Sequence, residues 1–231
     1  MSVTAQTTLA QVEQAAIALG LALRGAFHCE PGDGVPAGRD GGGIQTLVLL
    51  GWIGGRQWPS FARSREAGDG APHPLDRWSK RIVDALATDF DASPFYPFGG
   101  PPYLPFQRWA ERGDDVFASP LGIYVHPDHG LWHSYRGALG FGERLELPER
   151  VARAHPCETC EAKPCLNACP VSAFNPGHYD VDRCAAHVKS VKGVTCFTGG
   201  CLARRACWVA PELAYGSDEA GFYMRAFTAA H

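Results

Sequence analysis

Apolar runs in the first two thirds of the chain predict most of its regular elements. Residues 9–23 are rich in alanine and leucine and follow threonines that can cap a helix, so we expect an amphipathic helix there. Residues 44–53 are continuously apolar and bounded by glycine, which predicts a strand buried on both faces. Residues 74–90 begin with proline and carry apolar residues at helical spacing, which predicts a second helix.

Other stretches predict turns and loops. Residues 30–43 are rich in glycine and proline and lack a phosphate-binding spacing, so we expect a plain loop. Residues 92–112 mix proline with aromatic residues and predict a rigid loop around the core, or alternatively an aromatic wall around a planar ligand. Residues 121–125 and 131–139 read as two strands of a hairpin joined by H-P-D-H-G. The polar residues 143–153 predict a linker.

Composition narrows the class of protein. The 231 residues are 45% hydrophobic and 11% aromatic, which is enough for one large core or two modest ones. A net charge of −3 gives no polyanion-binding signature, so we expect no nucleic-acid partner. No apolar run reaches the roughly 18 residues of a membrane span, and Met1-Ser2-Val3-Thr4 shows no secretory leader, so we expect a cytoplasmic protein without a membrane partner.

Cysteine spacing carries the strongest chemical signal. Eight of the nine cysteines fall between Cys157 and Cys207, and they begin with C-E-T-C-E-A-K-P-C-L-N-A-C-P. Zinc is one alternative, but structural zinc sites usually show two matched C-x2-C pairs and only one is present here. Disulfides are another, and the odd cysteine count argues against them. Cys29 stands far upstream and is expected to be a simple thiol.

This run resembles that of bacterial ferredoxins with two [4Fe–4S] clusters, in which the fourth cysteine, before proline, binds the other cluster. The resemblance departs from the pattern in two places, since the gap from Cys160 to Cys165 is longer and Trp208 stands where proline would follow Cys207. It implies a crossed set of metal ligands. One cluster would bind to Cys157, Cys160, Cys165 and Cys207, and the other to Cys169, Cys184, Cys196 and Cys201.

Two further resemblances can be named, one for the cysteine segment and one for the region before it. The cysteine segment, with its R-C pair at residues 183–184, resembles the double-cluster module of epoxyqueuosine reductases and reductive dehalogenases. Residues 119–139 and the P-L-D-R-W stretch at 74–78 are similar to the CblC cobalamin-processing family. That similarity implies a nitroreductase-like α+β domain in which His126, Trp132 and Arg136 lie near a corrin or flavin. A metal site on His126, His129 and His133 is not expected, because a hairpin would turn them to different faces.

We therefore expect an α+β protein with a CblC-like domain at residues 1–150 and a ferredoxin-type domain at 151–231. The leading hypothesis is a redox protein that passes electrons from two [4Fe–4S] clusters to cobalamin or a substrate in the N-terminal domain. An electron carrier whose N-terminal domain only docks a partner, and a flavin-dependent reductase of the same fold, remain alternatives. Expected partners are a redox protein and a small-molecule substrate. The N-terminal domain should hold a cofactor-sized cleft toward the clusters, lined by rings of residues 95–106 and by Arg136.

Overall fold

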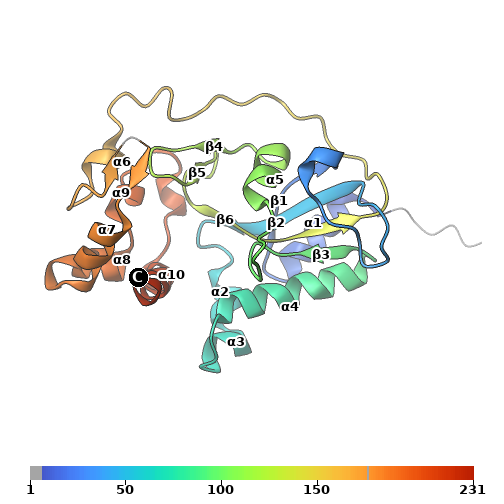
Figure 1. Ribbon diagram of the computed structural model, residues 1–231, viewed down its shortest axis with the longest axis horizontal. Helices are drawn as coiled ribbons and strands as arrows, with labels where there is room; N and C mark the ends of the chain where they lie inside the picture. Colours follow the sequence, from blue (N-terminus) through green and yellow to red (C-terminus); the bar gives the residue numbers. More distant parts are fainter. Residues whose placement is uncertain (1–6, 176) are drawn as a thin grey trace, which may run out of the picture. The chain divides into compact units, whose positions relative to one another are not determined.

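The computed structural model describes residues 7–175 and 177–231 and mixes helices with short sheets, as expected for an α+β protein (Figure 1). The expectation of no leader at residues 1–4 lies outside the described residues. Contacts between residues divide the chain into two compact units. Unit 1 comprises the described residues up to Trp52, Arg56–Asp115 and Ser134–Val151. Unit 2 comprises Ile53–Gly55, Val116–His133 and Ala152–His231.

Unit 1 is built on a four-stranded sheet of order β1-β2-β6-β3. Its strands are β1 (Ala22–His28), β2 (Thr46–Ile53), β3 (Ser93–Phe95) and β6 (His133–Phe141). Its helices are α1 (Leu9–Ala18), α2 (Trp58–Ala62), α3 (Arg65–Gly68), α4 (Pro74–Asp89) and α5 (Phe106–Gly113), with the short 3-10 helix η1 (Pro31–Asp33). The pairs β1–β2 and β3–β6 are antiparallel.

Two predicted elements of unit 1 are confirmed. Strand β2 is buried on both faces, because Leu47 and Leu49 join a core cluster while Trp52 packs its ring 5.5 Å from that of Trp78. Helix α4 begins at Pro74, as expected, and buries the predicted apolar stripe. The first helix is shorter than predicted. It ends at Ala18, and Gly20 with a φ of 85° turns the chain into β1, a strand that the sequence reading missed.

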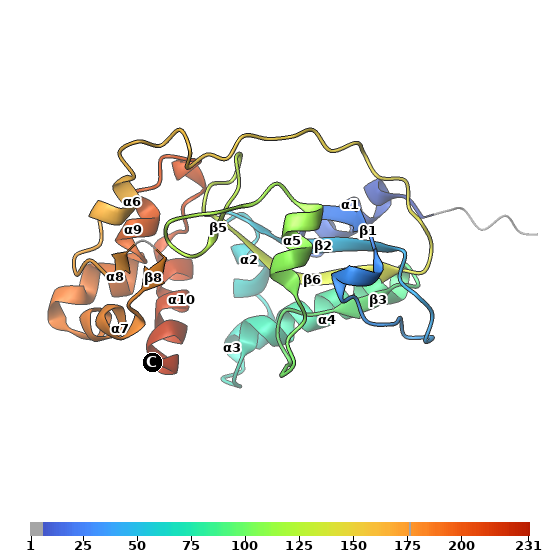
Figure 2. The ribbon, with the colours of Figure 1, turned by 45° about the horizontal axis from the view of Figure 1, so that its top comes forward.

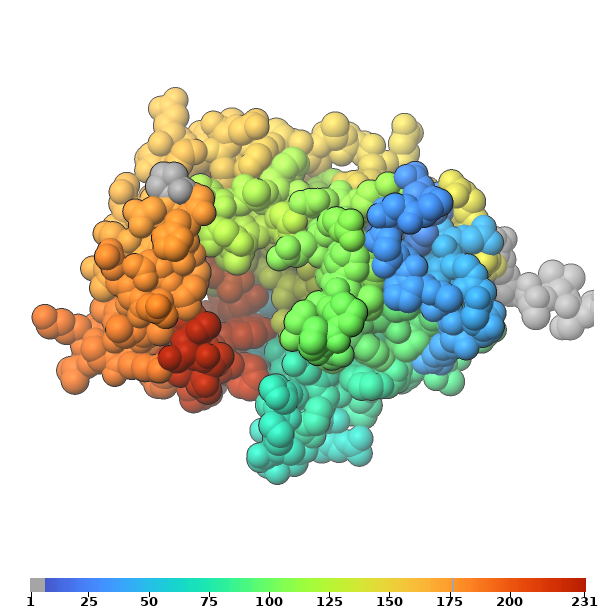
Figure 3. Space-filling view, viewed as in Figure 1, coloured from blue at the N-terminus to red at the C-terminus, as the bar shows by residue number. Residues whose placement is uncertain are grey.

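The proline-aromatic segment wraps the core of unit 1. Phe95 and Phe106 are buried, and their rings lie 6.0 and 4.7 Å from that of Trp109 on α5. The expectation that these two rings line an open cleft is therefore wrong, because α5 folds back over β1 and closes the core above them. The proline-rich turn at residues 99–103 lies at the surface (Figure 3). Within it, Tyr103 is 67% exposed.

Unit 2 consists of short helices and two small hairpins. Its helices are α6 (Pro164–Asn167), α7 (Val181–Lys189), α8 (Val194–Gly199), α9 (Leu202–Arg205) and α10 (Ser217–Ala230), with the 3-10 helices η2 (Val191–Gly193) and η3 (Pro211–Leu213). Its strands are β4 (Phe117–Ala118), β5 (Tyr124–Val125), β7 (Phe174–Asn175) and β8 (His178–Tyr179). Among the described residues, no helix has both the length and the apolarity needed to span a membrane.

The predicted hairpin around H-P-D-H-G is wrong in its pairing. Strand β5 pairs with β4, and the strand after the turn, β6, joins the sheet of unit 1 between β2 and β3. Only the bridge between His126 and Gly130 remains of the predicted pairing. The turn packs with the cysteine segment through Leu121, Val125 and Leu131, and for this reason unit 2 takes in Val116–His133 as well as the chain after residue 151. Residues 144–155 carry no helix or strand and run extended (Figure 2).

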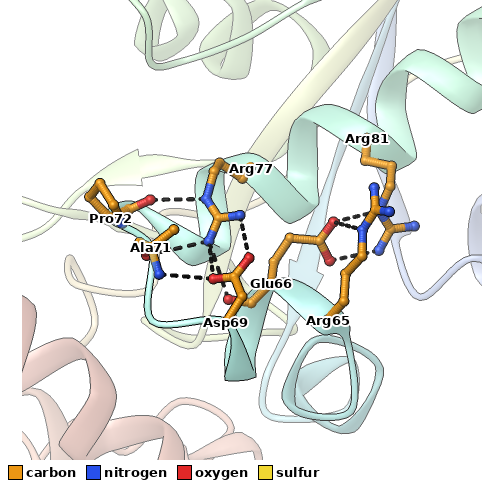
Figure 4. A network of polar contacts seen from close by, with 7 residues as sticks. All are labelled: Arg65, Glu66, Asp69, Ala71, Pro72, Arg77 and Arg81. Atoms are coloured by element: carbon orange, nitrogen blue, oxygen red, sulfur yellow. Dashed lines mark hydrogen bonds and ion pairs between the residues drawn. The ribbon is translucent and has the colours of Figure 1, made fainter.

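A buried carboxylate ties α3 to α4. Glu66, whose side chain is 4% exposed, accepts hydrogen bonds from Arg81 Nε and Nη2 at 2.6 and 2.9 Å (Figure 4). Arg65 Nε adds a third at 3.2 Å. These donors, Arg81 first, hold the pKa of Glu66 well below its usual range. A second pair nearby, Arg77 with Asp69, lies in solvent.

Replacing Glu66 with glutamine is expected to destabilise unit 1 by about 1–2 kcal/mol at pH 7, an estimate reduced because Arg81 is partly exposed. Because the pKa of Glu66 is lowered on folding, this stabilisation is fully present above about pH 4.3 and is lost as the pH falls below that value. The difference in unfolding free energy between wild type and variant should therefore be smaller at pH 3.5 than at pH 7. Urea unfolding followed by tryptophan fluorescence measures it. Asp69→Asn is the matched control and should cost less. Equal losses of unfolding free energy in both variants, or a loss in Glu66→Gln that does not depend on pH, would contradict this role of Glu66.

Candidate functional site

The eight downstream cysteines all lie in unit 2, on elements too short to place them without tertiary packing. Cys157 and Cys160 lie in the loop before α6, Cys165 lies within α6, and Cys169 follows that helix. Cys184 lies in α7, Cys196 in α8, Cys201 caps the start of α9 and Cys207 follows its end. All of these cysteines, and Cys29, are free thiols.

Four of them form a first group by the electrostatic effect of their thiols on one another. Burial is the main cause that raises the pKa of the Cys157 thiol, and three neighbouring thiols raise it further: Cys207, Cys165 and Cys160. The pKa of Cys165 is raised by burial, then by Cys207 and Cys160. Burial also raises the pKa of Cys207, with Cys160 again contributing. The members of this first group are therefore electrostatic neighbours of one another.

The other four form a second group. The pKa of Cys196 is raised by burial first, and then by the thiols of Cys184 and Cys169. For Cys201 the pKa is raised in the same way, by burial and then by Cys184 and Cys169. Cys169, only four residues after Cys165, thus has its thiol neighbours in the second group. No thiol of one group appears among the causes that shift a thiol of the other.

Backbone and side-chain donors point at several of these sulfurs. Ala173 N–H donates to Cys169 Sγ at 3.3 Å. Backbone N–H groups of residues 203 and 204 donate to Cys201 and oppose the rise in its pKa. The Tyr179 hydroxyl donates to Cys184, and burial together with this bond raises the pKa of Tyr179. Such donors stabilise thiolate charge, which is the form that binds iron or zinc.

The donor set fits iron–sulfur clusters. Eight thiols in two groups of four match the four thiolates that each [4Fe–4S] cluster needs. In the part of the chain that the structure describes, no three His, Cys, Asp or Glu side chains are close enough to share one metal ion. Apolar side chains shield the sulfurs. Leu121, Val125, Leu131 and Ala203 pack against five of the cysteines: Cys157, Cys165, Cys169, Cys201 and Cys207. The sequence reading missed this role for residues 121–131 because it assigned them to a hairpin of the N-terminal domain.

Cys29 belongs to unit 1, whereas the other eight cysteines belong to unit 2. Burial, and then the neighbouring Asp33 carboxylate, raise the pKa of its thiol to about 11. A thiol with so high a pKa is a poor nucleophile and a poor metal ligand at neutral pH. It has no part in either group.

The three residues expected near an organic cofactor are all engaged in other contacts. His126 is buried, accepts the Asp128 N–H on Nδ1 at 2.9 Å and stacks 4.1 Å from the His129 ring. Arg136, in unit 1, lies over Trp52 with its guanidinium carbon 5.5 Å from the ring centre, and its Nε is 3.3 Å from Ser134 Oγ. Trp132, in unit 2, lines a cavity of about 70 Å³, which is far too small for a corrin or flavin ring.

Comparisons with known proteins give distant structural likenesses only. No protein-family model matches the chain, and no curated protein sequence is significantly similar to it. Among solved structures, an epoxyqueuosine reductase with an epoxyqueuosine-modified tRNA-Tyr stem loop is 16% identical with a TM-score of 0.41, over 77% of this chain and 54% of that one. Epoxyqueuosine reductase from Bacillus subtilis is 17% identical with a TM-score of 0.40, over 72% and 48%. A selenomethionine-labelled epoxyqueuosine reductase is 15% identical with a TM-score of 0.42, over 77% and 52%.

The chain spans about half the length of these reductases. The first of them corrects one expectation from the sequence. It is a complex with a tRNA stem loop, a finding that contradicts the expectation of no nucleic-acid partner. That exclusion rested on a net charge of −3, which sums over the whole chain, whereas contacts to phosphate depend on where individual cations lie.

Tyr179 is expected to tune the second group of cysteines. A hydrogen bond to a ligand sulfur favours the more negative, reduced state of a cluster, so Tyr179→Phe should lower the reduction potential by on the order of a few tens of millivolts. The ring can keep its stacking on Phe174, whose centroid lies 4.6 Å away. Redox titration followed by electron paramagnetic resonance measures the shift. Tyr103→Phe, at an exposed ring in unit 1, is the control and should leave both potentials unchanged. An unchanged potential in Tyr179→Phe would contradict the role.

Proposed function

We propose that the chain is an iron–sulfur redox protein with two [4Fe–4S] clusters, which passes single electrons to an acceptor bound by unit 1. The first group of cysteines would hold one cluster and the second group the other. When bound, the clusters supply one-electron transfer. This function is the one that the chemistry of the donor set supports best, since two groups of four thiols match the ligands that two [4Fe–4S] clusters need.

The observation that carries the proposal is the position of Cys169. Its sequence neighbours Cys160 and Cys165 belong to the first group, yet its electrostatic partners are Cys184, Cys196 and Cys201. A zinc site built on local C-x2-C spacing gives no reason for this crossing. A ferredoxin run with two clusters requires it.

The residues around the thiols have definable tasks in this function. Thiolates of the two groups hold iron, and the N–H and hydroxyl donors on Cys169, Cys184 and Cys201 stabilise their charge. Leu121, Val125 and Leu131 keep water from the sulfurs and so help to set the potential. No proton transfer is needed in these steps.

The acceptor is the open part of the proposal. The resemblance to epoxyqueuosine reductases and to the CblC family favours cobalamin, with a modified nucleoside in tRNA as a candidate substrate. The positions of His126, Trp132 and Arg136 do not favour it, since each side chain already has protein contacts and the cavity beside Trp132 is small. We therefore derive no step through a corrin or flavin. An electron carrier without an organic cofactor remains the second candidate for that reason.

Reductive titration of the anaerobically purified protein tests the function. Two clusters predict uptake of about two electrons per chain, with bleaching of a broad visible absorbance. A bound corrinoid or flavin adds sharp bands and further electrons, and its absence favours the electron-carrier candidate. Reoxidation by added cobalamin, flavin or tRNA then ranks the acceptors. A protein that takes up no electrons would overturn the proposal.

A further inference from the structure

A small cavity inside unit 2 has two arginines in a wall that is otherwise largely apolar and aromatic. Its volume is about 70 Å³, and the residues that line it include Trp132, Gly200, Cys201, Arg204, Arg205 and Tyr215. Among the described residues, no aspartate or glutamate lines it. The two arginines come from consecutive positions of α9, directly after Cys201. Local sequence offers no reason to single them out, because a pair of arginines on a short helix is ordinarily a solvated face.

Both guanidinium groups are fixed in place without a carboxylate partner in the described chain. Arg204 donates through Nε to the Leu131 carbonyl at 3.1 Å and through Nη2 to the Tyr215 hydroxyl at 3.1 Å. Arg205 donates through Nη2 to the Tyr215 carbonyl at 2.7 Å and through Nε to the Gly199 carbonyl. Backbone carbonyls and a hydroxyl orient the two cations but leave their full charge uncompensated.

A buried hydrogen-bond donor belongs to another residue that lines this cavity. Trp132 is 3% exposed and lines the cavity, and its Nε1–H has no hydrogen-bond acceptor among the described residues. The Arg204 guanidinium carbon lies 4.7 Å from the centre of the indole ring and that of Arg205 lies 5.9 Å away. A buried N–H without an acceptor costs about 1–3 kcal/mol, so such a group usually marks a missing partner.

We propose that this cavity binds one small tetrahedral oxyanion, of the size of phosphate or sulfate. The Nη1 groups of Arg204 and Arg205 and the Trp132 N–H would donate to it. The volume admits one such ion and excludes a nucleotide. The proposal goes beyond the redox function and does not depend on it, because none of the three donors is a cysteine.

The competing explanation is that the two arginines only balance the negative charge of a cluster held by Cys201 and its group. In that case the cavity holds water, and the Trp132 N–H donates to a water molecule. The two explanations differ in whether phosphate competes for the site and in whether Trp132 matters for that competition.

Isothermal titration of the anaerobically purified protein with inorganic phosphate, at constant ionic strength set by chloride, tests the proposal. One phosphate should bind per chain, and sulfate should compete for it. Arg205→Gln should weaken binding about tenfold or more, and Arg205→Lys should weaken it less, because it keeps the charge and loses the fork of donors. Trp132→Phe keeps an aromatic ring but removes the N–H, and should weaken binding several-fold.

Arg225→Gln, at an exposed arginine of α10 that does not line the cavity, is the matched control and should bind phosphate as the wild type does. Iron content of each variant is measured in parallel, so that loss of a cluster is distinguished from loss of the anion site. If Arg205→Gln fails to fold, Trp132→Phe and Arg205→Lys still decide. No phosphate binding by the wild type, or equal binding by Trp132→Phe and wild type, would overturn the proposal.

Discussion

Cys169→Ser is expected to abolish the same cluster as Cys196→Ser, and not the cluster lost in Cys157→Ser. Iron should fall from about eight to about four atoms per chain in each of the three variants. The reduced Cys169→Ser and Cys196→Ser proteins should share one electron paramagnetic resonance spectrum, because both retain the cluster of the first group. Cys157→Ser should give a different spectrum, because it retains the other cluster. The physical reason is that the thiol neighbours of Cys169 are Cys184, Cys196 and Cys201.

Cys29→Ser is the matched control for this series. Its thiol belongs to unit 1, whereas both groups belong to unit 2, so the variant should keep the full iron content and both spectra. A Cys169→Ser spectrum equal to that of Cys157→Ser would show that the two cysteines share a cluster, and the crossed grouping would have to be abandoned.

Removal of iron is expected to unfold unit 2 while unit 1 stays folded. Helices α6 and α9 have four residues each and α8 has six, which is too short for stability without packing or metal. Unit 1 instead has an apolar core around β2 with Leu47, Leu49 and Trp52 fully buried. After chelation without denaturant, trypsin should cut after Arg204 and Arg205, which are half-buried in the folded structure. Mass spectrometry of the digest identifies the sites.

Cleavage after Arg24 serves as the internal control for the same digest. Arg24 is buried and forms an ion pair with Asp114 at 2.7 Å within unit 1, so it should stay resistant before and after chelation. Equal resistance of Arg24 and Arg204 once the iron is gone would mean that unit 2 folds without metal.

Local sequence patterns predicted the helices and strands that local sequence determines. They failed where the pairing of one strand with another determines the structure. Helix α4 and strand β2 could be recognised because a periodic or continuous apolar run is enough to define each. Strand β1 was missed because Ala22 and Leu23 at its start continue the composition of α1, and only the turn at Gly20 separates the two elements. The partner of β5 could not be read from the sequence, because the choice of β4 over β6 depends on packing against the cysteine segment.

In the candidate site, too, some residues could be predicted from local spacing and others could not. Cysteine spacing was informative because a ligand run fixes which thiols can reach a common metal, and the ligand sets remain a prediction until metal is measured. Tyr179, Arg204 and Arg205 could not be selected in advance. Tyr179 matters because it forms a hydrogen bond to Cys184, and Arg204 and Arg205 matter because they line one cavity. Neither feature can be recognised from local residue spacing.

Quantification of iron, acid-labile sulfide and zinc in the anaerobically purified protein tests the central claim most directly. Two [4Fe–4S] clusters predict about eight iron and about eight sulfide per chain, with no stoichiometric zinc. One or two zinc atoms per chain without sulfide would contradict the account, because the eight thiols would then serve a structural zinc site and the chain would carry no electrons.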